Sequence, residues 1–338
     1  MPPCSRKAER NTFGVTRFSR REFLGAAALA LGVPLLNREV RAMESSSGVA
    51  RLEISHPRRF RILQLTDLHF FSRDKTTWNA FNRRTVEQMQ SLVQCAKPDL
   101  LIITGDVWSE DQNGLGEKHM RYAVQRFEAL GVPWAFTWGN HDQLKDFEAG
   151  HRILAEARNS LYRGADSDGN YVIDVIDLQA RRVWQIVCIN SRREGIRKEQ
   201  QRWLKGLPRI DSPRFAFFHI PLKQYDDIWR NGAAAGIYGE EPFTEKEDGS
   251  TLPILKSLGV VACFCGHDHQ NDYSGLADGV ELVYGRVSRS GGYGADTFQK
   301  GGKLITVNCT RGSFKWKSLT PDGARWHPAR GQRTIMAD

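Results

Sequence analysis

The chain has 338 residues, of which 40% are hydrophobic, and it carries a formal net charge of +9. The first 42 residues hold eight basic and three acidic side chains and account for +5 of that charge, so the remainder carries about +4. A charge this small gives little support to a specific nucleic-acid-binding function, although it favours an anionic substrate. The residues after position 42 are numerous enough for one large domain with a sizeable core.

The N-terminal segment has the pattern of an export signal. A basic stretch over residues 17–24 (RFSRREFL) precedes an apolar run over about residues 23–36 and small residues near position 42. The pair Arg20-Arg21 resembles the twin-arginine type of signal. We expect residues 1–42 to be cleaved after engaging the twin-arginine export machinery, which would place the protein in the periplasm or outside the cell. The alternative is a membrane anchor, but the run is shorter than the about 20 residues that span a bilayer.

Beyond residue 42, short apolar runs alternate with segments of helical periodicity. We expect residues 43–58 to be a linker that leads to the first strand, residues 59–320 to form the domain, and residues 321–338 to be a C-terminal tail. The predicted strands cover residues 60–65, 99–104, 134–138, 171–176, 183–190, 214–218, 260–264, 281–284, 304–308 and 313–319. The predicted helices cover residues 78–96, 118–130 and 144–157. This alternation predicts an α/β fold around a mixed sheet, with residues 171–176 and 183–189 paired as a hairpin.

Polar residues of the kinds that bind metals follow five of these strands. In chain order they are Asp67 and His69, then Asp106, then Asn140 and His141, then His219, and finally His267 and His269. Ligands of α/β sheets bind outside the carboxyl ends of the strands, so we expect these side chains to meet in space. Glycines precede three of the groups and would let the backbone turn sharply there.

A centre with two metal ions accounts for these residue types, because imidazole and carboxylate suit Zn, Fe and Mn. One ion can be held by Asp67, His69 and His269, the other by Asn140, His219 and His267, and Asp106 can bridge the two. Two such ions polarise a phosphoryl group and convert a bridging water into hydroxide at neutral pH. His141 would face the substrate, where it can protonate the leaving oxygen or stabilise charge in the transition state.

The ordered set Asp-x-His, Gly-Asp, Gly-Asn-His-Asp, His and Gly-His-x-His resembles that of the calcineurin-like metallophosphoesterase superfamily, over about residues 59–308. The resemblance implies a four-layer α/β/β/α sandwich of two mixed sheets flanked by helices, with a dimetal site at the strand carboxyl ends. It also implies the same division of metal ligands and the acid role of His141.

The segments FFHIPLKQY, GIYGEEP and CGHDHQNDYSG are most similar to the purple-acid-phosphatase-related branch that lacks the purple chromophore. Purple acid phosphatases carry a tyrosine ligand where this chain has Ser109, and they lack a histidine at the place of His69. The resemblance therefore implies a metal pair without the colour of an iron–tyrosine bond. It leaves the choice among Fe, Mn and Zn open.

Three further residues are candidates for supporting roles. Arg286 and Arg289 lie beside a Gly-rich loop over residues 290–302, and their guanidinium groups could grip a phosphate with paired hydrogen bonds. Asp142 could orient His141, or it could cap a helix that begins near Gln143. The sequence does not distinguish between these two roles of Asp142.

Taken together, these features predict an exported dimetal phosphoesterase that hydrolyses phosphomonoesters by attack of a metal-bridging hydroxide. The expected partners are a small phosphate-ester substrate and the export machinery, without a stable membrane span after cleavage. One alternative is a phosphodiesterase that acts on nucleotides or lipid head groups. Another is a binding protein on the same fold that has no catalytic activity, and the intact ligand set argues against it.

Overall fold

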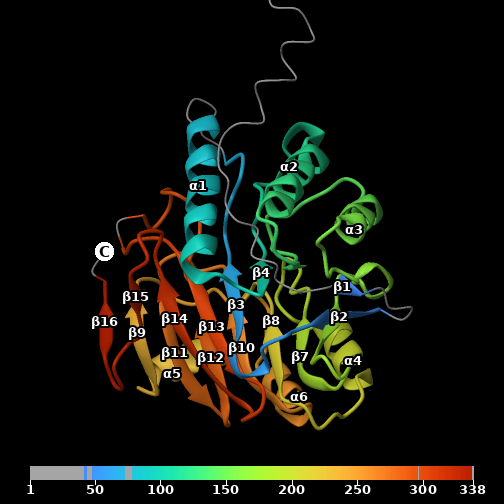
Figure 1. Cartoon of the computed structure of the whole chain (residues 1–338). Coiled ribbons are helices and arrows are strands. Elements are labelled where there is room, and N and C mark those ends of the chain that lie inside the picture. The colour runs from blue at the N-terminus through green and yellow to red at the C-terminus, as the bar shows by residue number, and fades with distance from the viewer. Residues whose placement is uncertain (1–41, 44–47, 73–77, 296, 337–338) are drawn as a thin grey trace, which may run out of the picture. The chain divides into compact units, whose positions relative to one another are not determined.

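Two mixed β-sheets lie at the centre of the structure, a computed structural model that describes residues 42–43, 48–72, 78–295 and 297–336 (Figure 1). The larger sheet has ten strands, in the spatial order β1 (Ala42–Met43), β2 (Val49–Glu53), β6 (Tyr171–Ile176), β7 (Arg182–Cys188), β8 (Arg214–Phe217), β10 (Val260–Cys265), β12 (Val280–Tyr284), β11 (Asp272–Ala277), β9 (Ala234–Tyr238) and β16 (Arg333–Ile335). Strands β7, β8, β10 and β12 are parallel, whereas β6 runs antiparallel to β7 and β11 antiparallel to β12.

The smaller sheet has six strands. Their spatial order is β15 (Arg325–Trp326), β14 (Ser313–Leu319), β13 (Gly302–Asn308), β3 (Phe60–Leu65), β4 (Leu100–Thr104) and β5 (Trp134–Thr137). Strands β3, β4 and β5 are parallel, so their carboxyl ends meet at one edge of the sheet. Strand β13 runs antiparallel to β3 and makes this sheet mixed as well.

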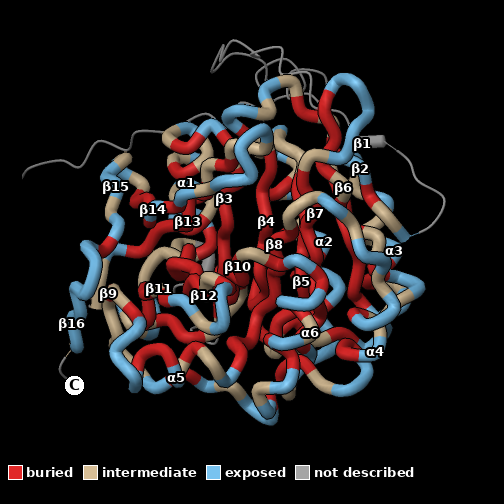
Figure 2. The backbone as a smooth tube through the Cα atoms, turned by 90° about the horizontal axis from the view of Figure 1, so that it is seen from below, coloured by how far each residue is buried: buried red, intermediate tan, exposed pale blue. Residues whose placement is uncertain are grey.

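The strands that lead to the predicted site form the core. Strands β4, β5 and β8 are buried at every position, and continuous apolar runs of this kind are typical of parallel strands that are covered on both faces. The two sheets pack face to face, since the ring of Phe215 on β8 lies 4.9 Å from that of Phe314 on β14. The Tyr171 hydroxyl on β6 also donates to the Phe136 carbonyl on β5. Figure 2 shows buried segments running through β4, β8 and β10.

Helices flank both sheets in the described part of the chain. They are α1 (Trp78–Ala96), α2 (Gly116–Ala129), α3 (Phe147–Glu156), α4 (Lys198–Gly206), α5 (Gln224–Arg230) and α6 (Thr251–Ser257), with short 3-10 helices at Pro57–Arg59, Gln112–Gly114 and Ala165–Ser167. Helix α1 packs on β3 of the smaller sheet, whereas α5 and α6 pack on β11 and β10 of the larger one. This confirms the predicted layering of helices on two mixed sheets. No helix in these ranges has both the length and the apolar composition needed to cross a membrane.

The predicted elements lie close to their expected positions, whereas helices α4, α5 and α6 and strands β9 and β11 were not predicted, and two regions are more ordered than expected. The predicted helix over residues 78–96 is α1, and the predicted hairpin is formed by β6 and β7. The expected linker contains β2, which pairs with β6, and the expected tail contains β15 and β16, which extend the smaller and the larger sheet. Except for Ala42, the predicted export signal lies outside the described residues and stays a prediction.

Candidate metal centre

The structure brings together all eight polar side chains that were predicted at strand ends. Strands β3, β4 and β5 of the smaller sheet and β8 and β10 of the larger one each deliver one or two of them. Six of the eight form two groups, within each of which the candidate ligand atoms lie within 4.8 Å of one another. The first group is Asp67, His69 and His269, and the second is Asp106, His219 and His267.

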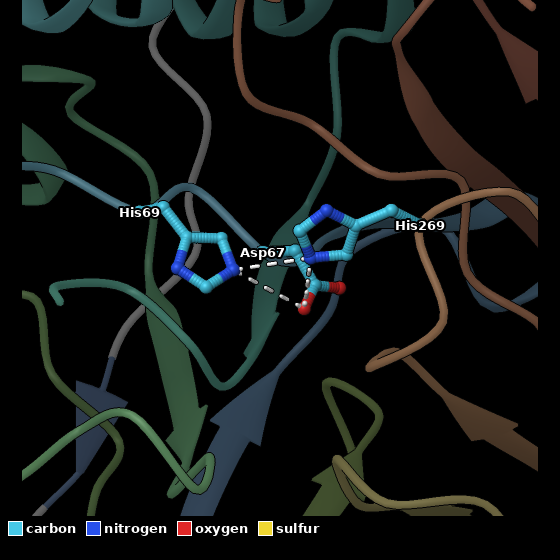
Figure 3. A group of neighbouring side chains, drawn as sticks. All are labelled: Asp67, His69 and His269. Carbon is cyan, nitrogen blue, oxygen red and sulfur yellow. Dashed lines mark hydrogen bonds and ion pairs between the residues drawn. The ribbon is translucent and has the colours of Figure 1, made fainter. Parts of the chain in front are cut away.

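The first group has the arrangement of a cation site (Figure 3). The His269 Nε2 atom lies 3.4 Å from Asp67 Oδ1 and 3.1 Å from His69 Nε2. Asp67 Oδ1 is buried and has no hydrogen-bond donor among the described residues, whereas Oδ2 accepts from the Thr66 hydroxyl. A buried carboxylate oxygen without a donor is costly unless a cation binds it, so this atom fits a metal ligand.

The second group is joined by Asn140. The His219 Nδ1–H group donates to the Thr104 carbonyl at 2.8 Å, which fixes the ring and directs Nε2 toward the site. That Nε2 atom lies 3.0 Å from Asn140 Oδ1 and 3.2 Å from His267 Nδ1. The amide oxygen and the two imidazoles therefore point to one place, which agrees with the predicted ligand set for the second ion.

Asp106 lies between the two groups. Its Oδ2 atom is 3.2 Å from His219 Nε2 in the second group and 3.6 Å from His69 Nε2 in the first. The Asp106 side chain is only 2% exposed, and its Oδ1 atom accepts from the backbone N–H of His141 at 2.9 Å. One carboxylate oxygen thus reaches both groups, as expected of a residue that bridges two ions.

The electrostatics of the centre also fit cations. Burial lowers the pKa of His69 to about 3 and that of His267 to about 4, so both imidazoles are neutral at pH 7 with a lone pair available for a metal. Burial would raise the pKa of Asp67, but His219 and His269 outweigh it and hold the pKa below its usual range. Burial would lower the pKa of His219, yet Asp106 raises it to about 10. Anionic carboxylates beside the neutral imidazoles of His69 and His267 are a suitable donor set for Zn, Fe or Mn. The raised pKa shows that the position of His219 Nε2 favours positive charge, and a metal ion bound there would replace the proton.

Several residues of the site have an unfavourable backbone conformation, which the surrounding fold stabilises. Asp67, His69, Asp106 and His267 have φ of 54°, 44°, 50° and 79°, in the left-handed region that non-glycine residues seldom adopt. Strain of this kind is concentrated at functional sites. The glycine before Asn140 is required by close approach, because a Cβ atom on Gly139 would lie 2.2 Å from Asp106 Oδ1.

His141 is not one of the grouped ligands. Its side chain is 40% exposed, and Nε2 lies 4.0 Å from Asp106 Oδ2. On the other side of the ring, Nδ1 lies 3.5 Å from Glu110 Oε1, and the Glu110 backbone N–H donates to the His141 carbonyl. We did not expect Glu110 from the sequence, and its place four residues after Asp106 was the only local signal. The geometry gives Glu110 the orienting position that we had considered for Asp142.

Asp142 has neither of the two predicted roles. Helix α3 is capped by Asp146, which accepts from the Ala149 N–H. Asp142 is 1% exposed and accepts from the backbone N–H groups of Gly139, Val107 and Trp108. Its carboxylate therefore ties the loop after β5 to the loop after β4 and positions Asp106 through the backbone. Burial and the nearby Asp106 raise the pKa of Asp142 to about 7.

The two arginines proposed to bind phosphate differ in the structure. Arg286 was predicted wrongly, because it is 6% exposed and its Nη1 atom lies 3.3 Å from Asp272 Oδ2 in a buried ion pair. Arg289 is partly buried beside the first group and donates to the Ser72 hydroxyl. Burial lowers the pKa of Arg289, and the Asp67 carboxylate opposes this shift. The positive charge of Arg289 therefore interacts with Asp67 of the first group.

Comparison with known proteins places the chain among metal-dependent phosphoesterases. A profile of the family described as calcineurin-like phosphoesterase matches residues 60–271. The chain is 25% identical over 316 residues to the protein of Arabidopsis thaliana named "Probable inactive purple acid phosphatase 28", which covers 77% of this chain and 78% of the relative. It is 27% identical over 261 residues to an uncharacterized protein of Schizosaccharomyces pombe, and these cover 69% of this chain but only 50% of that relative's length.

A solved structure shows the same fold. A dimetal phosphatase from Danio rerio superimposes with a TM-score of 0.52 and covers 73% of this chain and 92% of its own. Its sequence identity is 12%, so the likeness concerns the fold alone.

Proposed function

Because the chain belongs to the calcineurin-like phosphoesterase family, we propose that it is an exported enzyme that hydrolyses phosphomonoesters with two transition-metal ions. The observation that carries this proposal is the position of Asp106, whose Oδ2 atom faces His219 of one group and His69 of the other. Two such cations supply polarisation of the phosphoryl group and a hydroxide nucleophile at neutral pH.

Side chains next to the candidate metal ligands have further roles in the proposed reaction. His141 protonates the leaving oxygen from its Nε2 atom, on the solvent side of Asp106. The Glu110 Oε1 atom lies 3.5 Å from the opposite ring nitrogen, where the carboxylate can orient the ring. Arg289 adds positive charge beside the first group, which favours a dianionic monoester over a singly charged diester.

Export is proposed on the sequence of residues 1–42, through the twin-arginine machinery to the periplasm or the medium. N-terminal sequencing of the exported protein should then find a start near Met43. Recovery of a membrane-bound product that retains Arg20 and Arg21 would favour an anchor instead.

Activity itself needs a direct test, since relatives of this chain carry the word "inactive" in their names. The purified protein should be loaded with Mn, Fe or Zn and assayed on matched monoesters and diesters of the same alcohols. We expect turnover of the monoesters. Preferential turnover of diesters would replace the proposal with a phosphodiesterase, and binding of phosphate esters without any turnover would replace it with a binding protein.

A further inference from the structure

Two exposed aromatic rings stand beside the candidate metal centre. Phe243 is 61% exposed, and the centroid of its ring lies 6.0 Å from that of the His267 ring. Tyr293 is 59% exposed, and its ring lies 5.5 Å from that of His269. Phe243 and Tyr293 are exposed to solvent, whereas the candidate ligand His269 is buried. The two rings therefore lie on the outer side of the centre.

Single exposed apolar residues are common on protein surfaces, so exposure alone carries no functional meaning. The described residues include seven large apolar side chains of this kind: Leu115, Phe147, Leu178, Phe243, Leu276, Tyr293 and Ile335. Phe243 and Tyr293 differ from the other five by having a ring contact with a candidate ligand in the described structure. One of them lies next to the first group and the other next to the second.

Residues that adjoin the ligands anchor the backbone of Phe243 and the side chain of Tyr293. The Phe243 backbone N–H donates to Asp268, the buried carboxylate between His267 and His269, which also accepts from the Tyr284 hydroxyl at 2.7 Å. The Tyr293 hydroxyl donates to Glu240 Oε2 and accepts from Gln270 Nε2 at 3.0 Å. A rigid aromatic side chain loses little conformational entropy on binding a ligand, so these anchors favour a recognition role.

We propose that Phe243 and Tyr293 form an aromatic rim that selects phosphate esters whose leaving group carries a planar ring. The inference rests on the proposed function, because it takes the phosphate to bind at the metal centre with the leaving group extending outward. That outward path passes the two rings, and planar groups pack on aromatic faces with a gain in affinity. Esters of small aliphatic alcohols would reach the same metals without this contact.

The test compares benzyl phosphate with glycerol phosphate. Both release an alcohol, so the comparison does not depend on the acidity of the leaving group. Phe243→Ala and Tyr293→Ala should each lower kcat/KM for benzyl phosphate by about 3- to 10-fold, mainly through KM. Both variants should leave the value for glycerol phosphate within about twofold of the wild type, because that substrate lacks the contact.

Two control variants separate the rim from general surface effects. Leu276→Ala removes an exposed apolar side chain (62% exposed, on β11) and should change neither substrate. Tyr293→Phe keeps the ring and should retain the preference for benzyl phosphate. Equal losses for both substrates, or no loss for benzyl phosphate in either alanine variant, would overturn the inference.

A binding measurement distinguishes failure of the rim from failure of the proposed function. Calorimetry on the same metal-loaded protein would compare phenylphosphonate with methylphosphonate, neither of which can be hydrolysed. A preference for phenylphosphonate that Phe243→Ala and Tyr293→Ala remove would support the rim even if no ester is turned over. Equal affinity of the wild type for the two phosphonates would refute the rim even if esters are hydrolysed.

Discussion

Replacement of His141 by alanine separates proton transfer from metal binding. The ring is 40% exposed and stands outside the two ligand groups, with Nε2 at 4.0 Å from Asp106 Oδ2, so His141→Ala should leave folding and metal content unchanged. The variant should lose about 10²–10⁴-fold in turnover of alkyl phosphates, the usual contribution of a positioned general acid. This corresponds to about 3–5 kcal/mol of transition-state stabilisation.

The assay should use two leaving groups that differ in their need for a proton. An alkoxide requires protonation as it departs, whereas a phenolate with an acidic phenol leaves unaided, so the loss should be smaller for the aryl phosphate. Metal content is measured by elemental analysis on the same samples. Loss of metal in His141→Ala, or equal rate losses for the two leaving groups, would refute the reasoning and assign His141 to metal or phosphate positioning.

Three further predictions concern the residues packed around the centre and the identity of its metal ligands. Gly139→Ala should release metal and abolish activity, because its Cβ would lie 2.2 Å from Asp106 Oδ1, whereas Gly206→Ala, with no atom within 4 Å, should behave as the wild type in the same metal assay. Asp272→Asn should lower the free energy of unfolding in urea by about 3–5 kcal/mol, because it leaves two buried cations unpaired. Lys303→Met should lower the free energy of unfolding by less than Asp272→Asn does, because Asp272 remains paired with Arg286. An equal loss in the two variants would contradict that explanation. Iron-loaded protein should show no purple absorption band, because Ser109 cannot form an iron–tyrosine bond; a purple spectrum would refute this assignment.

The residues of the candidate metal centre were more predictable from the sequence than the residues that position them. The candidate ligands follow apolar runs, and parallel strands bring their carboxyl ends to one edge of each sheet, so local patterns were enough to group those after β3, β4 and β5 and those after β8 and β10. The meeting of the two edges depends on how the sheets pack together. The role of Asp142 depends on backbone donors 35 and 34 residues earlier in the chain, which no local pattern reveals. Arg286 was misassigned for a similar reason, since its partner Asp272 is part of a buried cluster with Lys303 and Ser318 from the other sheet.

The short strands show the same limit for the fold. Strands β15 and β16 have two and three residues. Strand β15 pairs with its sequence neighbour β14, whereas β16 pairs with β9, which lies far earlier in the chain. Apolar periodicity cannot mark such segments, because their residues are largely exposed. The long buried strands and α1 carry a strong pattern of their own and were found from it.

The most direct test of the account is the metal stoichiometry of the purified protein and of Asp106→Asn. The wild type should bind about two transition-metal ions per chain and hydrolyse phosphomonoesters only when they are present. Asp106→Asn should lower metal occupancy and turnover together, because one carboxylate oxygen faces both ligand groups at 3.2 and 3.6 Å. A wild-type protein that contains no metal and gains no activity with Mn, Fe or Zn would contradict the central claim.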